Sequence, residues 1–228
     1  MKILALETSS ERCSAALLVD AEVIERAQLA QRAHAELLLP MVESLLAEAG
    51  VTLTALGAVA FGRGPGGFTG LRVATSVAQG LAFGADLPVV PVSDLAVVAE
   101  GAHRLHGAQT ILACLDARMQ EVYWCGFNAS GPGRMEALGN EQLGPAAMVT
   151  PPAPGPWFGA GSAFGIYARV LSTRLGASLM GTDAGLLPMA RDVATLAAGL
   201  LAVGRVVRAD DALPVYLRDR VAEPKPAV

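Results

Sequence analysis

The sequence predicts an α/β fold made of two related halves, and three observations carry this prediction. Two apolar runs and a third extended stretch open the chain, and segments of helical and strand-like pattern alternate after them. A similar succession begins again near Thr110, which indicates a repeat of topology without evident sequence identity. The composition is globular, because 53% of the 228 residues are apolar and 17% are charged. A chain of this length can bury a core, as one large domain or as two subdomains.

The first half is expected to hold three strands followed by alternating helices and strands. An antiparallel meander is expected over residues 2–6, 13–19 and 22–30, where apolar runs are separated by polar turns. Apolar residues spaced three or four apart predict a helix over 34–49, with Pro40 inside it and Gly50 as its C′ residue. The later elements are a strand over 58–61, a helix over 69–83, a strand over 88–92, and a helix over 94–102 capped by Ser93.

The second half is expected to repeat this order with shorter elements. The strands are expected over 110–115, 121–127, 135–138, 157–159 and 179–180, and the helices over 144–148, 162–175 and 190–203. We divide the chain at residue 104: residues 1–104 form an N-terminal lobe and residues 105–228 a smaller C-terminal lobe. The helix over 190–203 is expected to pack back on the N-terminal lobe.

Composition and charge exclude several classes of function. The net charge is −4, from 17 basic and 21 acidic residues, which disfavours direct and unaided binding of RNA. The three cysteines lie far apart in apolar contexts, which indicates reduced core residues of a cytoplasmic protein. The first residues, MKILALETSS, reach an acidic residue too early for a secretion signal, and no apolar run approaches the length of a membrane span.

The stretch GRGPGGFTGLR, residues 62–72, joins an expected strand to an expected helix. It differs from the phosphate-binding pattern G-x-x-x-x-G-K-[ST] at one position, where Phe68 stands in place of the lysine. Phenylalanine cannot supply the cation that meets the phosphates. We interpret the stretch as a sharp turn that starts a helix, with Phe68 belonging to packing, although its N–H groups could still bind an anion.

Two groups of polar residues are candidates for a nucleotide or interlobe site. Glu7, Thr8 and Ser9 follow the first strand, where a carboxylate and hydroxyls could meet a metal-bound phosphate or could satisfy their own turn. Asp116 and Arg118 follow a strand of the second half, where they could serve the same site or form a salt link within a hairpin.

The histidines and the nucleophile patterns indicate no metal and no catalytic residue. His34 begins the helix over 34–49, and His103 and His106 lie where a helix is expected to pass into a loop. We expect solvated histidines rather than a metal site, because no third ligand lies near His103 and His106 and zinc needs three or four. The nucleophile motif G-x-S-x-G is absent from the sequence. The helix over 34–49, by contrast, is apolar on nearly two sides, which predicts a second packing partner.

Five groups of residues together resemble the TsaB family, also called YeaZ, in register over nearly the whole chain. They are residues 3–9 (ILALETS), 34–40 (HAELLLP), 64–72 (GPGGFTGLR), 116–118 with 121–123 (DAR and EVY), and 216–218 (YLR). The resemblance implies a two-lobed fold of the actin/Hsp70/sugar-kinase (ASKHA, ribonuclease H-like) type. It also implies a role in forming N6-threonylcarbamoyladenosine (t6A) at position 37 of tRNAs that read ANN codons.

The resemblance further implies a subunit that is not itself catalytic. In this group the transferase is the paralogue TsaD, which holds a metal through two histidines four residues apart. Asp94 and Val98 stand at those positions here, and Val98 cannot ligate a metal. We therefore expect no cofactor of its own, with ATP and a metal on the partner proteins. The alternative is an ATP-dependent phosphotransferase or a metallopeptidase. Tight binding of ATP, or stoichiometric zinc, in the isolated chain would support that alternative.

The expected role is to bind partners. The resemblance implies pairing with TsaD through the helices over 34–49 and 69–83, self-association as a homodimer through the same surface when TsaD is absent, and recruitment of the ATPase TsaE. Contact with tRNA is expected through the complex. The residues expected at the pairing surface are Leu38, Met41, Val42, Leu45, Thr69, Leu71, Ala74 and Ala78.

Overall fold

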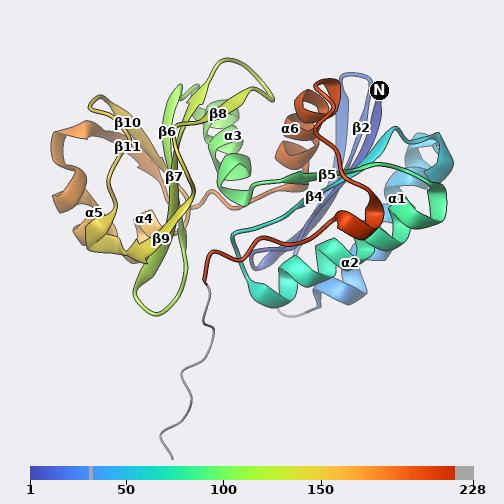
Figure 1. Ribbon diagram of the computed structural model, residues 1–228, viewed down its shortest axis with the longest axis horizontal. Helices are drawn as coiled ribbons and strands as arrows, with labels where there is room; N and C mark the ends of the chain where they lie inside the picture. Colours follow the sequence, from blue (N-terminus) through green and yellow to red (C-terminus); the bar gives the residue numbers. More distant parts are fainter. Residues whose placement is uncertain (31–32, 219–228) are drawn as a thin grey trace, which may run out of the picture.

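The first sheet begins at the second residue of the chain and mixes antiparallel and parallel strands. In the computed structural model, which describes residues 1–30 and 33–218, five strands lie in the order β3-β2-β1-β4-β5 (Figure 1). Their bounds are β1 Lys2–Glu7, β2 Arg12–Val19, β3 Glu22–Leu29, β4 Ala58–Gly62 and β5 Val89–Val92. β1, β2 and β3 form an antiparallel meander, whereas β4 and β5 run parallel to β1.

The second sheet repeats the arrangement of the first. Its strands lie in the order β11-β10-β6-β7-β8, and β9 pairs with β7 beside β8. Their bounds are β6 Thr110–Asp116, β7 Glu121–Ala129, β8 Met135–Ala137, β9 Gln142–Pro145, β10 Trp157–Ala160 and β11 Leu179–Asp183. β6 is antiparallel to β7 and parallel to β10, as β1 is to β2 and β4. The predicted two-lobed α/β fold of the ASKHA type, with its repeat of topology, is therefore confirmed.

Helices cover both faces of the first sheet, which explains why β1 is apolar at every position from Ile3 to Leu6. α1 (His34–Ala49) and α2 (Phe68–Ala85) pack on one face, against Leu4, Leu6 and Phe61. α6 (Ala190–Ala202) packs on the opposite face, against Ile3 and Ala5 (Figure 1). A helix late in the sequence thus completes the core of the first half.

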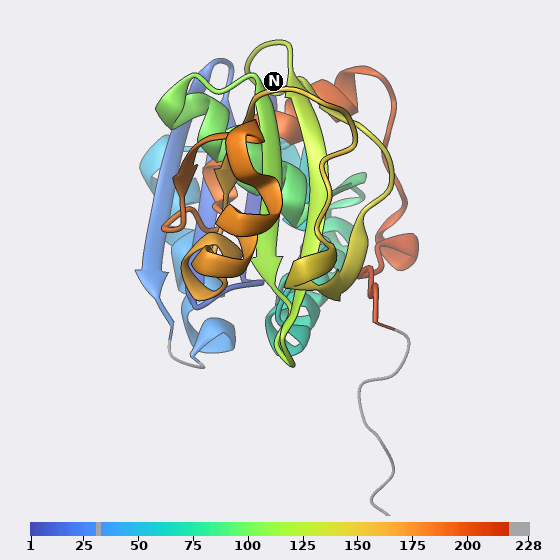
Figure 2. The same cartoon turned by 90° about the vertical axis from the view of Figure 1, so that its left-hand side faces the viewer.

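A helix from the first half covers the inner face of the second sheet, just as α6 from the second half covers the first sheet. α3 (Asp94–His106) packs Leu95 and Val98 against Ile111 on the inner face. α4 (Ala163–Ile166) and α5 (Ala168–Leu175) cover the outer face, where Figure 2 draws them in orange in front of the strands. The division at residue 104 stays a prediction, since α3 runs across it.

An ion pair joins α3 and α6 where these two helices meet. Arg104 of α3 donates from Nε and Nη2 to the two carboxylate oxygens of Asp192 on α6, at 2.8 and 3.0 Å. Asp192 is buried, and such bidentate, charge-assisted bonds fix geometry as well as charge. The two halves are therefore held together by this buried ion pair as well as by apolar packing.

Two of the predicted helices differ from the structure, and the cysteine prediction holds. Residues predicted as a helix over 144–148 form the end of β9 and a short 3-10 turn, because Gly144 pairs with Val122 of β7. The helix predicted over 162–175 is divided into α4 and α5 at Tyr167, whose φ and ψ of −111° and 26° leave the helical region. All three cysteines are free and buried.

Two helix ends carry the capping residues that the sequence predicts. Gly50 ends α1 in the left-handed region with φ 61°, and Ser93 accepts a hydrogen bond from the N–H of Ala96 at the start of α3.

Within the described part of the chain, a helix of the length and apolarity that a bilayer crossing demands does not occur.

Candidate functional site

The glycine-rich loop between β4 and α2 packs directly on the turn between β1 and β2. The N–H of Gly67 donates to the carbonyl of Ser9 at 2.7 Å, and the hydroxyl of Thr8 donates to the carbonyl of Gly70 at 2.7 Å. A Cβ on Gly66 would lie 2.7 Å from the Cβ of Ser9, and one on Gly70 would lie 1.8 Å from the carbonyl oxygen of Thr8. The glycines thus permit close approach of two backbones, and the turn fills the space in front of α2 where a phosphate would bind.

Phe68 does not belong to the core, in contrast to its predicted packing role. Its side chain is 42% exposed and its ring centroid lies 5.4 Å from that of Tyr216. The guanidinium of Arg72 stacks 3.8 Å above the Phe68 ring and donates from Nε to the Tyr216 hydroxyl at 3.2 Å. These three side chains form an exposed aromatic and cationic cluster at the start of α2.

Two buried carboxyl groups meet beneath the glycine-rich loop. Glu7 ends β1 and Asp94 begins α3, and both side chains are fully buried. A Cβ on Gly62 would lie 1.8 Å from Glu7 Oε2 and 2.3 Å from Asp94 Oδ1, so both oxygens lie over the same Cα atom. Glu7 Oε1 accepts the N–H of Ser9 at 2.5 Å, but Glu7 Oε2, both Asp94 oxygens and Ser9 Oγ have no hydrogen-bond partner.

The electrostatics of this pair favour a bound proton. Burial raises the pKa of Asp94 well above its usual range, and the neighbouring Glu7 charge raises it further. Burial raises the pKa of Glu7 as well, while the hydrogen bond from the Ser9 N–H opposes that shift. Two buried carboxyl groups this close favour one shared proton over two charges, because a charge on Glu7 raises the pKa of Asp94.

The structure separates the predicted interlobe residues into two places. Glu7, Thr8 and Ser9 lie buried beside Asp94, and no hydrogen bond or ion pair among residues 1–30 and 33–218 links them to Asp116 or Arg118. Asp116 forms a hairpin salt link with Arg118 at 3.4 Å and accepts the hydroxyl of Tyr167 at 2.9 Å. A site shared by the two groups stays a prediction.

The histidines all lie on helices, His34 at the predicted helix start and the other two within α3 rather than in a loop. His34 starts α1 with Nε2 2.9 Å from the Ser10 carbonyl, and His103 and His106 lie in the last turns of α3. His106 contacts Asp183 Oδ2 at 2.8 Å. Within the part of the chain that the structure describes, three or more metal-ligating side chains never gather in one place.

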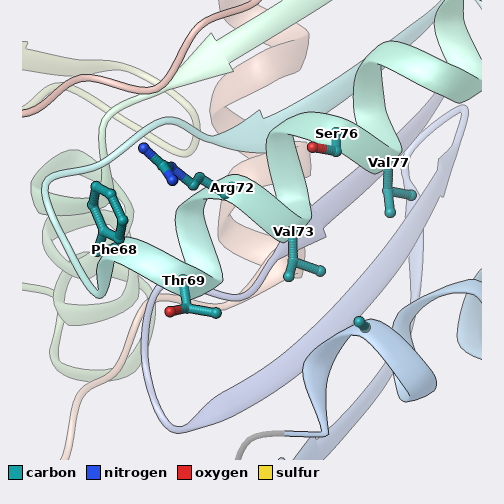
Figure 3. Close-up of a pocket in the computed structure, with 7 residues that line it drawn as sticks. Phe68, Thr69, Arg72, Val73, Ser76 and Val77 are labelled. Atoms are coloured by element: carbon teal, nitrogen blue, oxygen red, sulfur yellow. The ribbon is translucent and has the colours of Figure 1, made fainter.

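An open apolar groove runs between α1 and α2, and we call it the α1–α2 groove. It encloses about 400 Å³. Its lining residues are Ala35, Phe68, Thr69, Arg72, Val73, Ser76 and Val77. Figure 3 shows six of these side chains along α2, with α1 lying opposite. The far flank of α2 is covered by the segment after α6, where Gln79 donates to the carbonyl of Ala212 at 2.8 Å.

Most of the residues predicted for the pairing surface lie in the core instead. Six of them are at most 2% exposed and belong to the core under α1 and α2 or to its edge: Leu38, Val42, Leu45, Leu71, Ala74 and Ala78. Met41 is half-buried and Thr69 is exposed. The six buried side chains hold the helices on the sheet and cannot contact a partner directly, so the prediction is wrong for them.

The sequence did not reveal which positions of α2 face outward. Val73 and Val77 are apolar and four residues apart, as are the buried Ala74 and Ala78. The one signal was the excess of apolar residues on the helix over 34–49, which indicated an extra contact without showing where on α2 it would lie.

Comparisons with known proteins give the relationship of the chain. Residues 21–200 match the family model described as "TsaD: tRNA N6-adenosine threonylcarbamoyltransferase". The chain is 39% identical to the tRNA threonylcarbamoyladenosine biosynthesis protein TsaB of Escherichia coli (strain K12), over 97% of this chain and 96% of that protein. It is 52% identical to the TsaB protein of Haemophilus influenzae over 54% of this chain and 52% of that protein. The solved structure of YeaZ from Pseudomonas aeruginosa superimposes with a TM-score of 0.88 at 46% identity, covering 95% of this chain and 99% of that chain. With a TsaD-type domain and a relative that matches over almost its whole length, the chain belongs to the TsaB (YeaZ) family.

Proposed function

We propose that this protein serves tRNA threonylcarbamoyladenosine biosynthesis as a partner subunit that binds a TsaD-type transferase. The names of the relatives reported above include tRNA threonylcarbamoyladenosine biosynthesis, which supports a role of this chain in that process. The observation that carries the binding role is the α1–α2 groove, an exposed apolar surface on two helices that pack firmly on the sheet. Contiguous apolar patches of this kind mark interaction sites.

The groove has the composition of a protein interface. Its rim holds the Phe68, Arg72 and Tyr216 cluster, and aromatic residues and arginine are enriched where partners bind tightly. Leu39 and Phe83 extend exposed apolar surface along α1 and α2, at 44% and 82% exposure. A second copy of the chain would use the same surface, so homodimer and heterodimer are expected to compete.

The catalytic chemistry is assigned to the partner. Val98, which stands where the transferase has a metal-ligating histidine, packs in the core against the second sheet. Asp94, at the other position, is buried against Glu7. We assign the ATP and the metal to the partner proteins, with TsaE joining the pair and tRNA held mainly by TsaD, because the net charge here is −4.

Placing a cation in the groove should break the pairing without unfolding the chain. Ser76 is exposed and lines the α1–α2 groove, so Ser76→Arg adds a large charge where the partner's apolar surface would lie. We expect the affinity for TsaD to fall at least about 100-fold, the size of a hot-spot loss. Titration calorimetry with purified TsaD measures it.

The matched control is Ser172→Arg on α5, an exposed helical serine outside the groove. It should bind TsaD like the wild-type chain. Undiminished binding by Ser76→Arg would show that the groove is not the pairing surface. Reconstituted modification of tRNA, with and without this chain, tests the role itself: full rates with TsaD and TsaE alone would contradict it.

A further inference from the structure

A second cavity lies between the two halves of the molecule, away from the α1–α2 groove, and we call it the interlobe cavity. It encloses about 400 Å³, within the range of small-molecule sites. The end of β5 and the first turn of α3 form one wall, β7 and β8 form another, and α6 with the segment after it closes a third. Neither of the polar groups that the sequence suggested for an interlobe site lines it.

The walls combine an apolar body with a few charged groups. Val92, Phe127, Leu196 and Leu200 supply apolar surface from both halves. Binding sites for small ligands usually have this make-up, with a small number of polar groups that set orientation.

The charges in the wall leave one cation without a counterion. Arg63 and Glu141 neutralise each other across the halves, with Nη2 and Oε1 3.1 Å apart. Arg205 also lines the cavity, and no acidic side chain of the described chain lies within ion-pair distance of it. The lining therefore carries a net charge of +1, from two arginines and one glutamate.

The backbone holds Arg205 in place. Its N–H donates to the carbonyl of Leu200 at 2.9 Å, in the turn that ends α6. Two residues later, Val207 exchanges hydrogen bonds with Val89 of β5, both at 2.9 Å. The backbone of this segment is therefore fixed at the mouth of the cavity, and the Arg205 side chain is exposed and reaches a ligand from there.

We propose that the interlobe cavity binds a small organic monoanion with an apolar body, whose acidic group pairs with Arg205. The apolar part lies against Phe127, Leu196 and Leu200, and the ligand contacts both halves at once. This inference does not depend on the pairing surface.

Two fluorescent probes of similar size test the charge and the cavity separately. The anion 8-anilinonaphthalene-1-sulfonate and the neutral N-phenyl-1-naphthylamine differ by the sulfonate group, and both fluoresce more strongly in apolar sites. With the isolated full-length chain, Arg205→Ala should weaken binding of the anion about tenfold, the loss of one charge-assisted hydrogen bond, and leave the neutral probe unchanged. Ala137→Phe should weaken both probes, because Ala137 lines the cavity and a phenyl ring would fill it.

The control is Arg208→Ala, which removes an exposed arginine outside the cavity and should change neither affinity. Circular dichroism and urea midpoints confirm that each variant is folded. The proposal is overturned if Arg205→Ala binds the anion as the wild type does. It is equally overturned if Ala137→Phe leaves both affinities unchanged, since the probes would then occupy another surface.

Discussion

Replacing Gly70 with alanine should destabilise the fold by about 3 kcal/mol, the upper end of the usual cost of overpacking. The new Cβ would lie 1.8 Å from the carbonyl oxygen of Thr8, which is backbone and cannot rotate away. The β1–β2 turn is also fixed, because Thr8 and Ser9 are buried and bonded to Gly70 and Gly67. Urea denaturation of both proteins measures the difference.

A glycine-to-alanine substitution elsewhere on α2 should change the stability of the chain in the opposite direction. Gly80 lies on the same helix, and a Cβ there would meet no atom within 4 Å. Gly80→Ala should therefore stabilise the chain by about 0.5 to 1 kcal/mol, the ordinary gain from removing a helical glycine. Equal effects at the two positions would mean that helix propensity, rather than the contact with Thr8, decides the outcome.

The strands and helices could be predicted because their signals are local. β1 reads as a continuous apolar run since helices cover both faces of its sheet, and the ends of α1 and α3 carry a glycine and a serine that cap helices. The helix predicted over 144–148 failed for a reason that is not local. Gly144 is held by pairing with Val122 on β7, a contact that the pattern of residues around it does not show.

The Glu7–Asp94 pair illustrates a site that topology could have revealed. β1, β4 and β5 run parallel, so their carboxyl ends meet at one edge of the sheet. Glu7 ends β1, Gly62 ends β4, and Asp94 follows β5 by two residues. The outward positions of α2 could not be found in the same way, because exposure depends on how the sheet, α1 and the segment after α6 share the sides of that helix.

Raising the pH above the ordinary range of a carboxyl group should destabilise the protein through the Glu7–Asp94 pair. Burial raises the pKa of Asp94 well above its ordinary value of 3.8, so between those two values the folded chain binds a proton that the unfolded chain has released. The free energy of unfolding contributed by the pair is then fully present below the unfolded pKa and is lost as pH rises through the folded pKa. Its slope approaches about −1.4 kcal/mol per pH unit, the value for one proton.

Asp94→Asn isolates this contribution. The amide keeps the shape of the side chain, and its NH₂ group can donate to Glu7 Oε2 as a proton shared by the two carboxyl groups would. The difference in unfolding free energy between Asp94→Asn and the wild-type chain should therefore shift in favour of the variant as pH rises, in urea titrations from pH 6 to about 9. Glu43→Gln, at an exposed carboxylate on α1, should leave the slope of the wild-type profile unchanged. A difference that does not depend on pH would mean that the pair holds no proton in this range. The unpartnered oxygens of Glu7, Ser9 and Asp94 would then need a bound cation instead, because two buried carboxylates cannot remain ionised side by side without one.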